Sequence, residues 1–365
     1  MGVSEHSKAQ KYQRKRNWIT LFDMCLTVAL LGLMVQTNIH TSFLELAKGY
    51  DHKVVQILVF FLLFSIYFFI FQVPLRFYSS YVLEKQFNLS NQSLASWSLE
   101  SCKRYLVSFI FMFLLVLILY YLIWNFPDAW WACAWLTYAL ISLGIGKLFP
   151  ILIAPLFYKF LPIENEQLRI RVLNLVNRFG MKLENVYTFN LSKTTKKANA
   201  AFCGIGSTKR IMLADTLLKN FTEDEIEMVI AHELGHYRNH DIWKQFIIGL
   251  LTSLAIFYVA FDLLNSSSLG RQGIDDLLLL PNLCIILFVA NLLVGPFINA
   301  YSRFIEREAD RFALQTIPAK DVFISTMEKL CATNLADPNP NPVIEFLLYD
   351  HPSIGKRIRF AHEFK

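Results

Sequence analysis

Residues 231–236 read Ala231-His232-Glu233-Leu234-Gly235-His236. The two histidines are four residues apart, so on a helix their rings share one face and can both bind one Zn²⁺. Glu233 lies one step around the helix, where its carboxylate can take a proton from an attacking water. The preceding Thr222-Glu223-Asp224-Glu225 is typical of a capping box that opens such a helix. The alternative is a chance H-E-x-x-H on an amphipathic helix, and the rest of the chain has to decide.

The chain around this motif is unusually apolar for its length of 365 residues. It is 55% hydrophobic, has a mean hydropathy of +0.38 and contains 32 phenylalanines, which excludes an ordinary soluble surface. A helix needs about 20 apolar residues to cross a bilayer. Six stretches have this length: 18–37, 54–75, 105–125, 130–153, 244–264 and 277–298. No A-x-A-like cleavage site closes the first stretch, so we expect a retained span and not a signal peptide.

Lysine and arginine between the spans predict the orientation, because cytosolic loops carry an excess of both. Five lysines and arginines lie in the N-terminal tail and four in the 76–104 connection. Twelve lie in the segment after the fourth span and nine in the C-terminal segment. The opposite side carries three, which are Lys48, Lys53 and Arg271. We therefore expect both termini and both polar segments in the cytosol, in the endoplasmic reticulum or a bacterial inner membrane. This pattern accounts for the net charge of +6, so we expect no nucleic-acid partner.

The predicted fold is a mainly α-helical integral membrane protein of about six or seven spans with a small cytosol-facing α+β unit. We expect four regions: 1–160 with four spans, 161–243 with the H-E-x-x-H, 244–298 with two spans, and 299–365. A helix is predicted over 164–179, strands over 186–189, 199–202 and 210–213, and a turn at Gly204–Ser207 between the last two. A short helix over 81–88 is expected near the membrane surface.

A catalytic zinc needs a third protein ligand beyond the two histidines. Two spans separate His236 from residue 300, so the chain returns to the same side of the membrane with Ser302–Asp310. Glu306 and Asp310 share a helix face there, Glu306 as a candidate ligand and Asp310 as a partner for the outer N–H of a zinc histidine. The alternatives are Glu308 as the ligand, or an ordinary charged helix surface around Arg303 and Arg307.

Near the C-terminus, His351-Pro352-Ser353 begins a short helix with Arg357 on it. A histidine and an arginine beside such a site can polarise a substrate carbonyl or stabilise an oxyanion. The alternative is a capped surface helix without a catalytic role.

In its motifs the chain resembles the integral-membrane CAAX prenyl proteases, which are zinc metallopeptidases. The matching segments are Ile153–Phe157, Asn199–Phe202, Ile211–Leu218, His232–His236, Ser302–Asp310 and His351–Arg357. The resemblance implies that His232, His236 and Glu306 hold one Zn²⁺, with Asp310 beside them and Glu233, His351 and Arg357 catalytic. It also implies that the backbone of Asn199, Ala200 and Ala201 pairs with the substrate as an added strand. The better-known members have seven spans, and His-Pro-Ser here replaces their His-Pro-Pro.

We therefore expect a membrane-embedded zinc metalloendopeptidase that acts on hydrophobic or C-terminally prenylated CAAX-type peptides. One alternative is a general quality-control protease that cleaves misfolded membrane proteins. Another is a non-catalytic membrane zinc-binding protein or transporter, although no predicted span carries paired acids or histidines for an ion path.

Overall fold

The computed structural model describes residues 3–180, 186–204, 209–266 and 273–364. Within these ranges the protein is mainly helical and contains one four-stranded sheet. Residues 205–208 of the predicted turn, and Arg271, lie outside the described residues.

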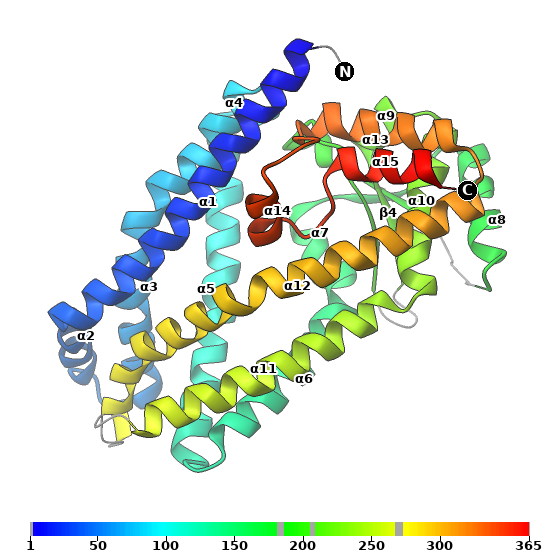
Figure 1. Cartoon of the computed structure of the whole chain (residues 1–365). Coiled ribbons are helices and arrows are strands. Elements are labelled where there is room, and N and C mark those ends of the chain that lie inside the picture. The colour runs from blue at the N-terminus through cyan, green and yellow to red at the C-terminus, as the bar shows by residue number, and fades with distance from the viewer. Residues whose placement is uncertain (1–2, 181–185, 205–208, 267–272, 365) are drawn as a thin grey trace.

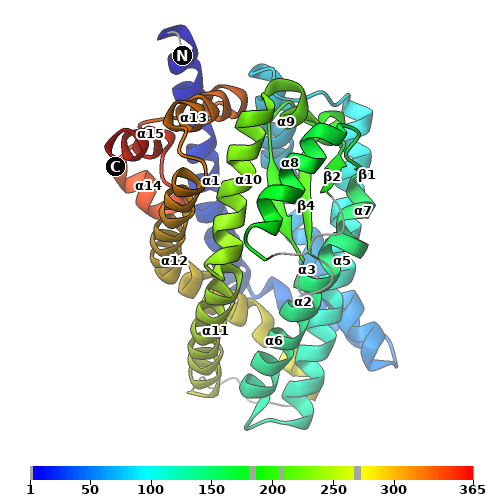
Figure 2. The same ribbon diagram turned by 90° about the vertical axis from the view of Figure 1, so that its right-hand side faces the viewer.

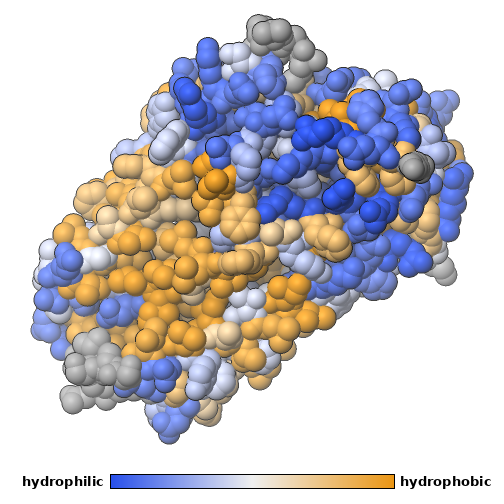
Figure 3. All heavy atoms as spheres, viewed as in Figure 1, coloured by the Kyte–Doolittle hydropathy of each residue, from blue (hydrophilic) through white to orange (hydrophobic). Residues whose placement is uncertain are grey.

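Six helical segments in the described chain are long and apolar enough to cross a membrane, as predicted. The helices that carry them are α1 (Val3–Thr37), α3 (Lys53–Phe77), α5 (Leu94–Asn125), α6 (Trp130–Leu148), α11 (Asp241–Ser266) and α12 (Leu280–Thr316). Short α2 (Ile39–Lys48) joins α1 to α3. Large apolar side chains point outward from these helices, and Leu251, Leu293 and Phe297 are each more than half exposed. Figure 3 shows the resulting broad apolar surface, with hydrophilic residues gathered at the other end of the molecule.

Residues 81–88 do not form the separate surface helix that we expected. Instead α3 continues through a π-helical turn, Tyr78–Val82, into α4 (Leu83–Gln86). No glycine or proline interrupts residues 77–86, so backbone hydrogen bonding continues with only a change of register. The helix ends before Asn88, whose φ of 61° is the left-handed conformation that asparagine tolerates. The fourth membrane helix, α6, similarly passes through a π-helical turn, Phe149–Ile153, into α7 (Ala154–Phe157).

The sheet has the strand order β1-β2-β4-β3. The three predicted strands are present as β2 (Val186–Phe189), β3 (Ala200–Cys203) and β4 (Arg210–Ala214). Strand β1 (Phe160–Pro162) was not predicted, because three residues ending in proline show no alternation. The predicted helix α8 (Glu166–Asn177) is capped by the Asn165 side chain. Among the described residues β3 pairs only with β4, so its other edge is open there.

Helix α10 (Glu223–Arg238) begins with the predicted capping box and carries the H-E-x-x-H. It follows α9 (Asp215–Asn220) and lies between the sheet and α12, as Figure 2 shows. Helix α12 runs from the membrane region to the far side of α10 (Figure 1). Helices α13 (Lys320–Asn334), α14 (Pro342–Leu348) and α15 (Ile354–Glu363) complete this unit. Its apolar core includes Ile230, Leu234 and Ala313, which fix α10 against its neighbours.

Candidate metal centre and active site

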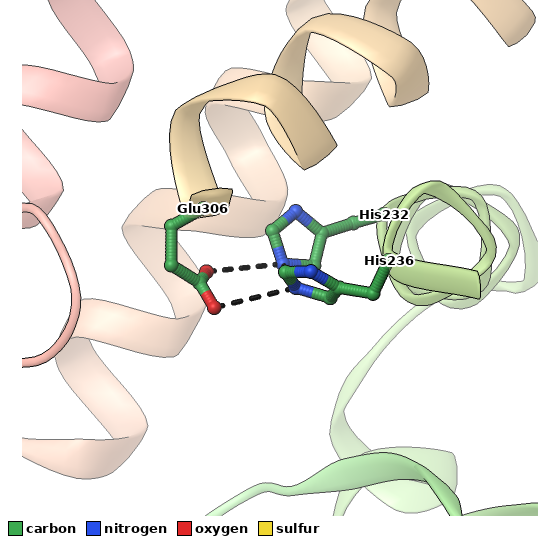
Figure 4. Close-up of side chains that lie close together, drawn as sticks. All are labelled: His232, His236 and Glu306. Atoms are coloured by element: carbon green, nitrogen blue, oxygen red, sulfur yellow. Dashed lines mark hydrogen bonds and ion pairs between the residues drawn. The ribbon is translucent and has the colours of Figure 1, made fainter. Parts of the chain in front are cut away.

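His232, His236 and Glu306 lie together, although two membrane helices separate the histidines from the glutamate in the sequence. Both histidines project from α10 toward Glu306 on α12 (Figure 4). The two Nε2 atoms are 3.2 Å apart. His232 Nε2 lies 3.2 Å from Glu306 Oε2, and His236 Nε2 lies 3.3 Å from Glu306 Oε1. Side chains from two separate helices thus converge on one point.

The outer nitrogen of each histidine faces a buried carboxylate. His232 Nδ1 lies 2.9 Å from Asp310 Oδ1, and His236 Nδ1 lies 3.1 Å from Asp241 Oδ2. A carboxylate only accepts hydrogen bonds, so each Nδ1 carries the proton and donates it. In the neutral rings both Nε2 atoms then direct lone pairs toward Glu306, which is the arrangement that a metal cation requires.

The spacing and charge of this cluster fit a tetrahedral metal ion. Ligand atoms about 2.0–2.1 Å from a tetrahedral zinc lie about 3.3 Å from one another. The two Nε2 atoms have this separation, and each lies about as far from one of the two Glu306 oxygens. Glu306 Oε2 is buried and has no hydrogen-bond partner in the described protein, so it has a free lone pair. Burial disfavours charge on His236, but Asp241 and Glu306 outweigh burial and raise its pKa to about 10. That shift reflects a negative potential suited to holding a cation.

Asp241 is the residue of this site that sequence reasoning missed. On a continuous helix a residue five positions after His236 would point to a different face. Helix α10 instead ends at Arg238, and His240 adopts a left-handed φ of 58° before α11 begins at Asp241. This break directs the Asp241 carboxylate back to His236. It also removes His240 from the helix face of the two ligands.

Glu233 lies between the metal cluster and the edge of the sheet. Its Oε2 accepts a hydrogen bond from the Phe202 backbone N–H on β3, at 3.3 Å. The side chain is partly exposed, unlike that of Glu306. Its carboxylate can therefore reach a water or a peptide bond in the space beside β3.

At the open edge of β3, the backbone N–H and C=O groups of every second residue point away from the sheet. Asn199 O accepts from Ala214 N at 3.0 Å, so the Asn199 carbonyl faces the sheet. In an antiparallel pair the direction alternates, which turns Ala201 inward and leaves Ala200 and Phe202 facing outward. Of the expected substrate-pairing residues Asn199, Ala200 and Ala201, only Ala200 therefore directs its backbone groups toward the free edge. Asn199 is exposed and can contribute its side chain instead.

His351 borders the cluster from the C-terminal segment. Its Nε2 lies 3.2 Å from Glu306 Oε1, while Nδ1 lies 2.8 Å from Asp350 Oδ1. The bond to Asp350 raises the pKa of His351 above its usual value. The imidazole is exposed on its open side, so it can meet a ligand beside the metal cluster.

Arg357 lies near the site but not in the position expected of a group that stabilises an oxyanion. Its Nε donates to Asp310 Oδ2 at 2.8 Å, and Nη2 lies 3.3 Å from His232 Nδ1. Those contacts are on the side of the ring opposite the Nε2 that faces Glu306. Arg357 is buried there, which makes it a positioning residue for Asp310 and His232. Glu308, the rival ligand, instead pairs with Arg311 at 2.9 Å.

Comparisons with known proteins agree with this arrangement. Residues 162–365 match peptidase family M48, and residues 1–159 match the CAAX prenyl protease N-terminal region, described as five membrane helices. The chain belongs to peptidase family M48. It is a metalloprotease and a multi-pass membrane protein. In residues 3–159 the structure has four helices of membrane-spanning length, one fewer than that description gives.

Two relatives and one solved structure show how far the likeness to other M48 proteins extends. An uncharacterized metalloprotease of Bacillus subtilis, YhfN, is 30% identical over 100% of this chain and 87% of its own length. A probable CAAX prenyl protease 1 of Schizosaccharomyces pombe is 28% identical over 87% of this chain and 71% of its own. The crystal structure of S. mikatae Ste24p covers 99% of this chain and 89% of its own, with a TM-score of 0.88 and 23% identity. That last likeness shows the fold.

Proposed function

We propose that this M48 protein is a zinc metalloendopeptidase that hydrolyses hydrophobic or C-terminally prenylated, CAAX-type peptides at a cytosol-facing site. The observation that carries the proposal is the convergence of two imidazole lone pairs and the Glu306 carboxylate on one point. Zinc bound there would supply Lewis-acid activation of water and of the scissile carbonyl. His232, His236 and Glu306 would hold it, oriented by Asp310 and Asp241.

The chain's own residues carry out proton transfer, substrate binding and oxyanion stabilisation. Glu233 takes the proton of the attacking water and passes it to the leaving amine, because its carboxylate lies between the cluster and β3. The outward backbone groups of Ala200 hold the peptide extended along the strand. His351 donates to the oxyanion that forms on the carbonyl, since its exposed ring borders Glu306. Arg357 holds Asp310, and through it the tautomer of His232.

The apolar helices and the names of the relatives support this proposed substrate class. A hydrophobic or lipidated peptide can approach the site from the bilayer, which a soluble protease does not offer. Relatives named as CAAX prenyl proteases occur in fission yeast, plants and animals. A general quality-control protease remains the second candidate within the same chemistry.

The decisive test is Glu233→Gln in the purified protein. We expect the variant to keep its zinc, measured by metal analysis, and to lose at least a hundredfold in cleavage of a farnesylated reporter peptide. Glu308→Gln is the matched control on α12 and should retain both zinc and cleavage. Chelation should abolish wild-type cleavage and added Zn²⁺ should restore it. Full activity in Glu233→Gln would contradict the mechanism.

A second comparison separates the two substrate classes. The wild-type protein is given a farnesylated C-terminal peptide, its unlipidated counterpart and an unfolded membrane protein. Preferred cleavage of the farnesylated peptide supports the CAAX-type assignment. Equal or faster cleavage of the unfolded protein supports quality control.

A further inference from the structure

A cavity of about 390 Å³ opens beside His351 and reaches the first membrane helix. Its wall includes Gln13, Arg16, Asn17 and Thr20 of α1, together with His351 and Arg357. Helix α14 lies between α1 and α12 in this region (Figure 1), and Asn17 Nδ2 donates to Tyr349 Oη at 3.3 Å. The N-terminal membrane helix thus contributes directly to the surroundings of the active site.

This cavity adjoins the start of strand β3. Asn334 lines it and bonds both backbone groups of Ala198, donating to its carbonyl at 3.3 Å and accepting from its N–H at 2.9 Å. At the other end of β3 a second cavity, of about 300 Å³, is lined by Phe202, His236 and Trp243 among others. A peptide extended along β3 would therefore pass the metal cluster with one end toward each cavity.

The direction of the peptide follows from strand pairing. Antiparallel pairing is the more stable arrangement per residue, so the substrate should run opposite to β3. Its N-terminal part then lies toward Phe202 and the aromatic second cavity, which suits a large apolar group. Its C-terminal part enters the cavity beside His351, between Ala198 and α1.

Arg16 is the cation of this cavity that forms no ion pair in the described chain, and its guanidinium interacts instead with the neutral Tyr12 hydroxyl. Arg357 is bound to Asp310, and His351 is bound to Asp350. Among the described residues, no carboxylate lies within ion-pairing distance of Arg16. The cavity's other acid is Asp337, whose Oδ1 accepts from the Asn339 N–H.

The neighbouring cation Lys197 is also paired, with Glu84 at 2.9 Å. A planar guanidinium that lines a peptide-sized cavity is suited to bind a carboxylate through two hydrogen bonds.

We propose that Arg16 binds the free α-carboxylate at the C-terminus of the substrate, so that the enzyme selects bonds a short distance from a chain end. This inference rests on the proposed peptidase function of the same site. It makes Arg16, on α1, a specificity-determining residue for a reaction whose chemistry takes place on α10 and α12.

The test uses two fluorogenic peptides that share an S-farnesylcysteine followed by three residues and differ only at the end, a free acid or an amide. Wild-type protein in detergent should cleave the acid with a kcat/KM about tenfold or more above that of the amide. The reason is that the amide loses the charge-assisted hydrogen bond to Arg16. In Arg16→Gln this ratio should fall toward one, and Arg16→Lys should restore part of it. Arg14→Gln, on the same helix beside a neighbouring cavity, should keep the wild-type ratio. A wild-type ratio within twofold of one, or a ratio unchanged in Arg16→Gln, would overturn the proposal.

Binding provides a readout that does not depend on turnover. In the Glu233→Gln background, the acid peptide should bind about tenfold more tightly than the amide by fluorescence anisotropy, and adding Arg16→Gln should remove the difference. Equal binding of the two peptides would reject the role of Arg16. Absence of metal-dependent cleavage of either peptide would instead count against the proposed function, while the binding comparison would still decide the role of Arg16.

Discussion

At the scale of single residues, the two candidate zinc ligands on α10 are oriented by different carboxylate partners. His232 is fixed by Asp310, which Arg357 holds in turn. His236 is fixed by Asp241, which is 3% exposed and bonds Lys244 at its other oxygen. Both carboxylates are buried, so replacing either one changes the ring orientation as well as the local charge.

We predict that Asp241→Asn weakens metal binding by roughly 10- to 100-fold, the effect expected when an outer partner of a metal histidine is lost. The amide can still contact Nδ1 but no longer stabilises the N–H form or adds negative potential. Zinc affinity is measured by competition with a chromophoric chelator. Lys244→Gln, which removes the half-exposed partner of Asp241 Oδ1 and leaves Oδ2 on His236, is the control. Unchanged affinity in Asp241→Asn would contradict this role.

At the scale of secondary-structure elements, the site depends on how closely α10 approaches α12. A Cβ on Gly235 would lie 3.0 Å from Ala309 Cα and 3.2 Å from Phe312 Cβ. Gly235 therefore allows the two helix backbones to come close enough for Glu306 to reach both histidines. A glycine is therefore needed at this position of the H-E-x-x-H motif for helix packing, and not for metal binding.

We predict that Gly235→Ala lowers stability by roughly 1–3 kcal/mol, the usual cost of overpacking, and reduces zinc affinity because the helices separate. Thermal unfolding in detergent and metal analysis measure both effects. Gly249→Ala on α11 is the matched control, since no atom lies within 4 Å of its added Cβ. The prediction fails if Gly235→Ala binds zinc and melts like the wild type.

The start of α10 is fixed by Glu225, which is 4% exposed. It closes the capping box with Thr222 and also accepts from Ser325 at 2.6 Å and Lys329 at 2.7 Å. Burial opposes its charge, but the Lys329 bond and the other donors hold the pKa of Glu225 below its usual value. Its ionised form therefore stabilises the fold above the unfolded pKa of about 4.3. That contribution is lost as pH falls through the lower folded pKa.

We predict that Glu225→Gln lowers stability at pH 7 by roughly 1–3 kcal/mol through loss of charge-assisted hydrogen bonds. Because the wild type loses the same contribution on acidification, the difference in melting temperature should shrink below about pH 4. Glu223→Gln removes only surface pairing and should be nearly neutral. A difference that grows on acidification would show that another group is responsible.

At the scale of the whole molecule, two membrane helices lie between the histidines and Glu306, so an even number of crossings returns the chain to one side. From the lysine and arginine bias we propose that this side faces the cytosol. We predict that green fluorescent protein fused to the C-terminus fluoresces in a bacterial host, because it folds on the cytosolic side. Alkaline phosphatase fused after Tyr50, between α2 and α3, should be active. An active phosphatase at the C-terminus would reverse the orientation.

Much of this architecture could be predicted from sequence because its signals are local or periodic. Apolar length predicted the six membrane helices, and alternation and turn residues predicted three of the four strands. The spacing of His232 and His236 placed them on one helix face. The crossing number placed Glu306 on the side of His232. Strand β1 and the continuation of α3 into α4 were not predicted, because three residues carry no period and a π-helical turn leaves no break in composition.

The sequence by itself therefore determined the membrane helices and the H-E-x-x-H helix, since each depends on hydrogen bonding and burial within one segment. It indicated Glu306 as a candidate ligand through the number of membrane crossings. Only the tertiary structure decided what surrounds the ligands. The left-handed turn at His240 brought Asp241 to His236, and the contact with Asp310 turned Arg357 away from the metal side. Packing across the molecule also placed Arg16 of α1 in the cavity beside His351. These contacts join segments far apart in the chain or depend on one backbone angle, and neither leaves a periodic trace in the sequence.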